Sequence, residues 1–341
     1  LLIGIWSFLS TRLYRFLYPP RSVLLIYGEH PVAGLMGKIH TRNDRFVIGE
    51  AVHISQGISM IMEKIRGYEG VVICDLPSHM RNVILKHCYE KGVRTYTTPK
   101  ISDVILRSAE SLHLFDTPLL LSRNKGLSFD QRAVKRGMDL ALSLTALLLL
   151  CPVFLVTAAA IKLYDGGPVF YFQERCTKDG KVFRICKFRS MVEDAEKEGN
   201  WIPATDRDPR ITPVGRIIRA TRMDELPQIL NILKGDMSIV GPRPERVEHV
   251  ELYTKQIPEF GYRMKVKGGL TGYAQVYGKY NTTAYDKLKL DLMYIQNYSL
   301  LLDIEIIFKT VKILFMKEST EGFELEDAAS MAEGYKAGKQ E

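Results

Sequence analysis

A run of 22 residues without a charged side chain, Leu140 to Ile161, constrains this chain more than any other feature. At a rise of about 1.5 Å per residue, a helix of that length reaches across the core of a bilayer. Two details argue against a straight crossing. Pro152 lies in the middle, where proline removes a backbone hydrogen bond and bends a helix. Basic residues also flank both ends, which favours the cytoplasmic side for both flanks: Arg132, Lys135 and Arg136 before the run, and Lys162, Arg175 and Lys178 after it.

We therefore predict a re-entrant helix over residues 138–163 that enters the membrane, bends at Cys151-Pro152 and leaves on the same side. A straight crossing and a fully buried core helix are the alternatives. The first segment, Leu1 to Leu17, is apolar and aromatic with Arg12 and Arg15 inside it, and Pro19-Pro20 ends it. We expect residues 1–18 to be the cytoplasmic end of a longer membrane helix. The alternative is an amphipathic surface helix, and the charged leader of a signal peptide is missing.

The overall charge is basic, with 47 Lys and Arg against 39 Asp and Glu and a net charge of +8. Such a balance suits an anionic partner: nucleic acid, an anionic lipid surface or a phosphorylated substrate. The five cysteines are scattered, and no two have the spacing of a zinc or redox motif. We expect reduced thiols facing the cytoplasm.

Residues 21–121 alternate short apolar runs with helical patterns, which predicts a doubly wound parallel sheet. The predicted strands are Val23–Tyr27, Phe46–Ile48, Val71–Cys74 and Val93–Tyr96, and the predicted helices are Met60–Arg66 and Arg81–Lys91. The first turn, Gly28 to Gly34, falls short of a dinucleotide fingerprint, since Pro31 intrudes and Glu29 places negative charge where a pyrophosphate would lie. A regulatory or assembly module is therefore favoured, with nucleotide binding as the alternative.

The densest polar segment runs from Arg216 to Glu245. Arg216, Arg219 and Arg222 recur every three residues, as on one helix face, and Asp224-Glu225 follows. Pro227 predicts a helix from about Asp224 to Lys234, because proline is tolerated only in the first turn. The two acids would then lie at a helix N-terminus. The alternative is that Asp224 only caps this helix, although Pro227 lacks the N–H that a good cap needs.

Adjacent acids can perform phosphoryl chemistry. One carboxylate can attack phosphorus, its neighbour can hold Mg²⁺, and clustered arginines can stabilise the transferring group. Two further basic clusters, Lys187 to Met191 with Arg189, and Gly241 to Glu245 with Arg243, have the same character. Each alone is more typical of a solvated surface.

Taken in order, these segments resemble the bacterial sugar transferase family, the monotopic phosphoglycosyl transferases, over Lys135 to Leu314. The matching motifs are Lys135-Arg136 with Asp139, the proline-broken apolar run, Gly167-Pro168-Val169-Phe170 with Gln173 and Arg175, Lys187-Phe188-Arg189-Ser190-Met191, Asp224-Glu225-Leu226-Pro227-Gln228, Lys234 to Pro244, and Gly269-Leu270-Thr271-Gly272 with Gln275 and Gly278.

The resemblance implies transfer of a sugar 1-phosphate from a UDP-sugar to undecaprenyl phosphate, with release of UMP. Asp224 matches the family's nucleophile and Glu225 the partner acid that binds Mg²⁺. The positions implied for phosphate or substrate binding are Lys187, Arg189, Arg219, Arg222, Arg243 and Asp291. Cys151, where the family often has Ser, and Pro152 match the break that turns the helix out of the membrane. Lys279 stands where Arg is more usual, which affects expected nucleotide contacts.

Larger members of the family place membrane helices and a Rossmann-like domain before the catalytic region. By this resemblance the chain is an α/β protein with a Rossmann-like, CoA-binding-like domain at 21–121 and a linker at 122–134. A mostly helical α+β catalytic domain follows at 135–316, and an acidic tail at 317–341. The residues from Tyr285 to Leu314 are expected to form an amphipathic helix, which either lies at the membrane interface or packs against the rest of the domain. The expected location is the bacterial inner membrane, with the catalytic domain on the cytoplasmic face.

The implied role is the first membrane step of exopolysaccharide, capsule or O-antigen synthesis, without a nucleic-acid partner. The N-terminal domain could mediate a homodimer. Two other hypotheses remain open: a non-catalytic membrane scaffold that holds anionic lipid, and a nucleotide-sensing redox-type module.

Overall fold

A computed structural model of the chain describes residues 2–28, 32–40, 43–122, 126–193, 195, 208–278 and 282–314. Its contacts divide into two compact units, Leu1–Lys100 and Ile101–Glu341. The division falls at Lys100, whereas the sequence analysis ended the first domain at residue 121. Each unit is described by itself below.

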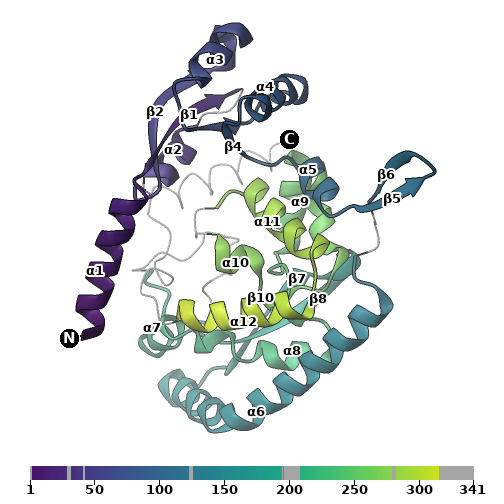
Figure 1. Cartoon of the computed structure of the whole chain (residues 1–341). Coiled ribbons are helices and arrows are strands. Elements are labelled where there is room, and N and C mark those ends of the chain that lie inside the picture. Colours follow the sequence, from purple (N-terminus) through teal and green to yellow (C-terminus); the bar gives the residue numbers. More distant parts are fainter. Residues whose placement is uncertain are drawn as a thin grey trace. The chain divides into compact units, whose positions relative to one another are not determined.

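The first unit contains a parallel sheet with the strand order β2-β1-β3-β4 (Figure 1). Its elements in chain order are α1 (Leu2–Leu17), β1 (Arg21–Tyr27), α2 (Ala33–His40), β2 (Phe46–His53), η1 (Ile54–Gln56), α3 (Ile58–Ile65), β3 (Gly70–Cys74), α4 (Ser78–Glu90) and β4 (Arg94–Thr97). The predicted strands and helices are confirmed, with boundaries that move by a few residues. The turn at Glu29-His30-Pro31 lies outside the described residues.

Both faces of this sheet are covered, which is why its central strands are apolar without alternation. On one face, buried side chains of β1 and β3 pack with Ile61 and Ile65 of α3 and Ile84 of α4. On the other face, Val23 and Leu25 of β1 pack against α2. The arrangement is a three-layer α/β unit.

In its described residues, the second unit combines helices with three two-stranded sheets. Its elements up to Ala220 are α5 (Ile101–Arg107), β5 (Glu110–Leu114), β6 (Thr117–Leu121), α6 (Phe129–Asp165), β7 (Phe170–Cys176), η2 (Lys178–Gly180), β8 (Val182–Phe188) and α7 (Pro213–Ala220). Those that follow are η3 (Met223–Glu225), α8 (Gln228–Lys234), β9 (Ser238–Val240), α9 (Val247–Gln256), η4 (Pro258–Lys265), β10 (Gly269–Thr271), α10 (Tyr273–Tyr277), α11 (Ala284–Gln296) and α12 (Leu300–Leu314).

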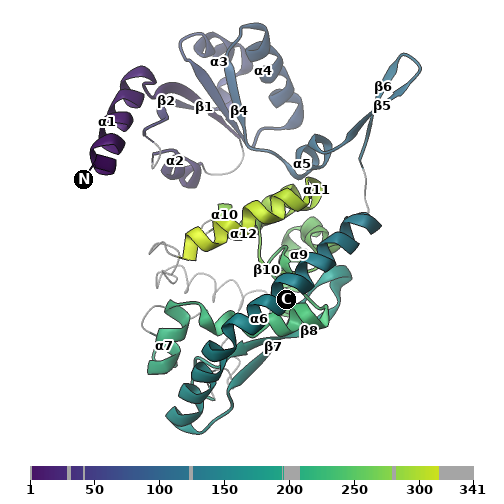
Figure 2. The same cartoon turned by 60° about the horizontal axis from the view of Figure 1, so that its bottom comes forward.

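Helix α6 is the long apolar helix that the sequence predicts (Figure 2). A capping box of Ser128 and Gln131 begins it, inside the range predicted as linker, and Gly166 at φ 73° ends it. Within the described residues it is the one helix long and apolar enough to cross a membrane. The helix continues through Pro152, and its middle is open to the surroundings, with Leu148 78% exposed.

Both ends of α6 are fixed to the same unit. Near its start, Lys135 Nζ lies 2.6 Å from the Asp303 carboxylate of α12, and Asp139 accepts hydrogen bonds from Ser238 and Ile239 of β9. Near its end, Ile161 is buried in a cluster with Phe188 of β8 and Ile218 of α7. The globular part of unit 2 therefore extends along the helix from one end to the other.

The predicted amphipathic helix from Tyr285 to Leu314 is two helices, α11 and α12. Asn297 ends α11 without helical ψ, and α12 begins three residues later. Helix α11 is largely internal, with Leu288, Asp291 and Leu292 buried, whereas α12 exposes Leu301 and Phe308. The acidic tail at 317–341 lies outside the described residues.

Candidate active site

Asp224 and Glu225 lie in a 3₁₀ turn, η3, between α7 and α8. The sequence analysis placed them in the first turn of an α-helix, and that prediction is wrong, because α8 begins only at Gln228. Pro227 explains the shift: it has no N–H for an i→i−4 bond, so the preceding turn uses i→i−3 bonds such as Leu226 N to Met223 O. No side chain caps α8, so Asp224 is not a cap.

The three arginines before the acids do not share one helix face. Arg216 and Arg219 lie in α7, but α7 ends at Ala220 and Arg222 has φ 56°, in the left-handed region. Such a conformation is unfavourable for a residue with a side chain and is concentrated at functional turns. Arg222 thus reverses the chain direction just before the acids.

Glu225 is held between two cations. Lys187 Nζ donates to Glu225 Oε1 at 3.0 Å, and Arg243 Nη2 donates to the same oxygen at 2.6 Å. Burial alone would raise the pKa of Glu225, but the charges of Arg243 and Lys187 outweigh it and hold that pKa well below its usual range. Glu225 in turn raises the pKa of Arg243. Glu225 is therefore a carboxylate that is charged at neutral pH and fixed by two cations.

Asp224 has the opposite environment. No described group donates a hydrogen bond to its carboxylate. Burial raises the pKa of Asp224, and the neighbouring charge of Glu225 raises it further, while Lys187 and, more weakly, Arg219 and Arg243 oppose the rise. The adjacent acids thus differ: Glu225 is an ionised carboxylate held by two ion pairs, and Asp224 is a carboxylate that accepts no hydrogen bond from the described residues.

Strand and loop geometry brings the two cations to Glu225. Lys187 is the penultimate residue of β8, which pairs with β7. Arg243 follows β9 between Pro242 and Pro244, which fix the backbone on both sides. Gly241 lies against the backbone of the segment that leads into β10, where a Cβ would approach the Lys267 backbone oxygen to 2.5 Å and the Gly269 nitrogen to 3.0 Å. Only glycine permits this close approach of the two strands.

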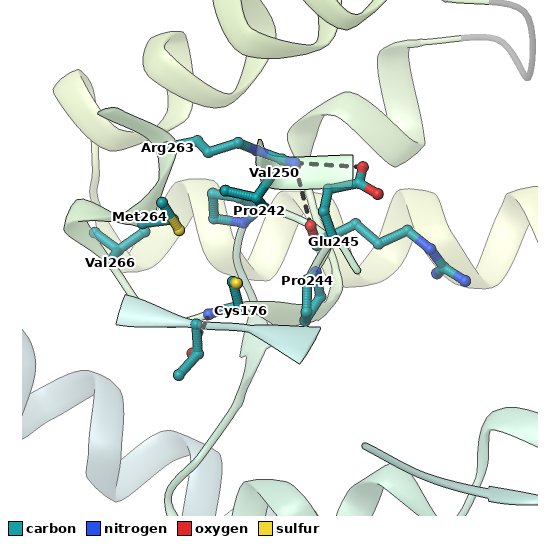
Figure 3. A pocket seen from close by; sticks show the side chains of 11 residues that line it. Cys176, Pro242, Pro244, Glu245, Val250, Arg263, Met264 and Val266 are labelled. Carbon is teal, nitrogen blue, oxygen red and sulfur yellow. Dashed lines mark hydrogen bonds and ion pairs between the residues drawn. The ribbon is translucent and has the colours of Figure 1, made fainter. Parts of the chain in front are cut away.

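A network of buried charged side chains fixes the backbone of Arg243. Arg263 donates from Nη2 to the Arg243 backbone oxygen at 3.0 Å, and its guanidinium also pairs with Asp291 at 2.7 Å and Glu245 at 3.3 Å. Figure 3 shows Arg263 directed towards Glu245. The charge of Arg263 contributes to a lowered pKa at Glu245. Sequence reasoning missed Arg263 and Glu245, because no local pattern links residues 18 to 46 positions apart.

The other predicted site residues lie elsewhere. Asp291 is completely buried and contacts Arg263, not the surface beside the acids. Arg189 is turned towards the end of α6, where it pairs with Asp165 and donates to Pro168 O. Cys151 and Pro152 belong to the exposed middle of α6, and Lys279 lies outside the described residues. The structure therefore gathers Lys187, Asp224, Glu225 and Arg243, with Arg219 close enough to influence Asp224.

No group of three or more His, Cys, Asp or Glu side chains that could hold a metal ion occurs in the described part of the chain. The acids of η3 are a pair. Mg²⁺ is commonly bound by one or two carboxylates together with substrate phosphates, so such a pair is a sufficient protein contribution.

Comparison with known sequences identifies the protein family of this chain. Residues 130–317, more than half of the chain, match the profile of the bacterial sugar transferases. The chain belongs to the bacterial sugar transferase family. It carries an additional N-terminal region, which contains the parallel sheet.

Named relatives share this region. The UDP-N-acetylgalactosamine-undecaprenyl-phosphate N-acetylgalactosaminephosphotransferase of Aeromonas hydrophila is 40% identical over 234 residues, 67% of this chain and 54% of that protein. The UDP-glucose:undecaprenyl-phosphate glucose-1-phosphate transferase of Escherichia coli is 43% identical over 203 residues, 58% of this chain and 42% of that protein. The exopolysaccharide production protein ExoY of Rhizobium meliloti is 38% identical over 191 residues, 52% of this chain and 83% of that protein. The chain spans about half the length of the first two.

Proposed function

We propose that this chain transfers a sugar 1-phosphate from a UDP-sugar to undecaprenyl phosphate and releases UMP, as the first membrane step of exopolysaccharide, capsule or O-antigen synthesis. Membership of the family and the activities named for its relatives support the reaction class. The observation that carries the chemistry is the contrast between Glu225, which two cations hold, and Asp224, which accepts no hydrogen bond from the described residues.

In the first half-reaction, an Asp224 oxygen attacks the sugar-linked phosphorus of the donor. The new bond joins that oxygen to phosphorus, and the bond from phosphorus to the bridging oxygen breaks. The electron pair leaves with UMP. In the second half-reaction an oxygen of undecaprenyl phosphate attacks the same phosphorus. The acyl phosphate bond then breaks, and the Asp224 carboxylate is restored.

The charges around η3 suit these steps. Lys187 and Arg243 are fixed by Glu225, so they are already oriented when negative charge moves onto the leaving phosphate. Both cations retain N–H groups beyond those that Glu225 uses. Asp224 remains the carboxylate that is able to move towards phosphorus.

Glu225 is the residue that would hold Mg²⁺, together with oxygens of the diphosphate. Glu225 fits this role, because the two cations donate to one of its carboxylate oxygens and the second oxygen remains available to a metal ion. A bound Mg²⁺ would neutralise charge on the diphosphate.

We also propose that α6 is re-entrant and anchors the domain on the cytoplasmic face of the inner membrane. The exposed apolar middle supports contact with lipid. The anchoring of Lys135 and Ile161 to one globular unit supports a helix whose two ends lie on the same side. A straight crossing would require that unit to extend through the bilayer.

A UMP-release assay tests the function. The 341-residue chain in nanodiscs is given Mg²⁺, undecaprenyl phosphate and each of several UDP-sugars, which include UDP-glucose and UDP-N-acetylgalactosamine. We expect UMP release with at least one donor and its loss in Asp224→Asn. No UMP release from any donor by folded wild-type chain would support the scaffold hypothesis. UMP release at the wild-type rate by folded Asp224→Asn would contradict the role proposed for Asp224.

A further inference from the structure

Beside the acids lies a small hollow whose lining the proposed mechanism does not fully use. It is lined by Arg175, Ile185, Lys187, Gln228, Arg243 and Pro244 and is partly open to solvent. Three of its side chains are cationic. Lys187 and Arg243 are the residues that hold Glu225, so the hollow adjoins the reacting pair.

Gln228 is the unexplained member of this lining. It is only 2% exposed, and its Nε2 has no hydrogen-bond partner among the residues that the structure describes. A buried amide N–H group without a partner costs free energy, because it has lost water and gained nothing in return. Gln228 is the first residue of α8, four positions after Asp224, so it is fixed to the same turn as the nucleophile.

Arg175 is also incompletely compensated. Its guanidinium donates to neutral acceptors, Gln173 Oε1 and Pro244 O. No carboxylate among the described residues lies within ion-pair distance of it. Burial lowers the pKa of Arg175 to about 10, and the nearby charge of Arg243 lowers it as well, although Glu245 opposes this. An anion in the hollow would relieve the accumulated positive charge.

We infer that this hollow binds a phosphate group of the substrate, with the Gln228 amide donating a hydrogen bond directly to a phosphate oxygen and Arg175, another residue of its lining, supplying charge. The inference rests on the proposed function and assigns it two further residues. A neutral amide donor orients the phosphate through a directional hydrogen bond and adds no charge. Arg175 adds a positive charge to a site that is already cationic. The phosphate belongs to the donor diphosphate or to the polyprenyl phosphate.

Two substitutions test Gln228. Gln228→Met keeps the length of the side chain and removes the donor, and Gln228→Glu keeps the shape and introduces a negative charge. Gln256→Met, at an exposed glutamine of α9, is the matched control. Arg175→Lys tests the contribution of Arg175 in the same way. Melting temperatures in nanodiscs show which variants are folded.

Binding is measured by titrating UMP, a UDP-sugar and inorganic phosphate into the 341-residue chain that also carries Asp224→Asn. This readout needs no covalent step, so it stays informative if the aspartyl mechanism fails. Transfer from preformed adduct to polyprenyl phosphate is measured separately in the Asp224 protein.

If the hollow holds the donor phosphate, Gln228→Met weakens donor binding about tenfold to a hundredfold, the loss expected for one hydrogen bond to a charged group, and Gln228→Glu weakens it more. If it holds the acceptor phosphate, donor binding is unchanged and the transfer step slows by a similar factor. Folded Gln228 and Arg175 variants that match the Gln256→Met control within twofold in every binding and transfer measurement would overturn the inference.

Discussion

Arg243 and Glu225 are joined by a hydrogen bond of 2.6 Å that links the Pro242-Arg243-Pro244 segment to the turn of the two acids. The bond makes one of two adjacent carboxylates a fixed counter-ion. The other, Asp224, accepts no hydrogen bond from the described part of the chain. We propose that this electrostatic difference between neighbours separates the nucleophile, Asp224, from the supporting acid, Glu225.

The first prediction concerns the pH dependence of adduct formation. Asp224 must be ionised to attack, and burial raises its pKa, so the rate should fall with decreasing pH earlier than for an ordinary Asp. Glu225→Gln removes a negative neighbour and should move this acid limb to lower pH. Lys187→Met removes a positive neighbour and should move it to higher pH. Pre-steady-state UMP release from pH 4 to 8 measures both, and shifts of the same sign would contradict the electrostatic account.

The second prediction concerns acid stability. Arg243 and Lys187 hold the folded-state pKa of Glu225 below its unfolded value, against the effect of burial. The ionised carboxylate therefore contributes stability above the unfolded pKa, and that contribution is lost as the pH falls through the folded pKa. Glu225→Gln should lower the melting temperature at pH 7 and differ less from wild type as the pH falls below about 4. A pH-independent difference would show that the ion pairs are not its origin.

The third prediction concerns the network behind Arg243. The Arg263 and Asp291 side chains are 4% and 1% exposed, so removing one partner leaves a buried charge unpaired. Arg263→Met should destabilise unit 2 by roughly 3–5 kcal/mol, and adding Asp291→Leu should recover part of that loss. Denaturant unfolding measures the change. As a control, Asp286→Asn in the more exposed pair with Lys289 should cost less than about 1 kcal/mol. Equal costs for the two pairs would argue against a supporting network.

The fourth prediction concerns the topology of α6. Asp130→Cys and Leu163→Cys place thiols near the two ends of the helix, at exposed positions. In a Cys151→Ser background, both should react with a membrane-impermeant maleimide from the cytoplasmic side only. The Cys151→Ser parent controls for the remaining cysteines. Labelling of the two positions from opposite sides would establish a straight crossing.

The sequence predicted elements well where one local pattern was sufficient. The strands of unit 1 follow continuous apolar runs, and α6 follows its charge-free stretch. The helix start near Asp224 was misplaced, because a 3₁₀ turn and an α-helical turn before Pro227 have nearly the same residue preferences. The break between α11 and α12 at Asn297 was also missed, since apolar residues continue on both sides of it.

The site was predictable as a set of residue types but not as a set of contacts. Lys187, Glu225 and Arg243 stood out as charged motif residues, yet nothing in the sequence indicated that one oxygen of Glu225 accepts from both cations. Arg189 and Asp291 were grouped with them on the same grounds, and the fold turns one towards Asp165 and encloses the other beside Arg263. Long-range contacts of this kind depend on the tertiary arrangement.

The most direct test of the central claim is the mass of the chain after it meets donor alone. Wild-type protein is mixed with Mg²⁺ and the UDP-sugar that it turns over, without undecaprenyl phosphate. The reaction is quenched, and mass spectrometry measures the masses of the intact protein and of its peptides. We predict an increase equal to one sugar phosphate, located on Asp224, that disappears when polyprenyl phosphate is added and never forms in Asp224→Asn. An active wild-type enzyme that carries no such adduct at any time, or an Asp224→Asn variant that still makes product at the wild-type rate, would contradict the account.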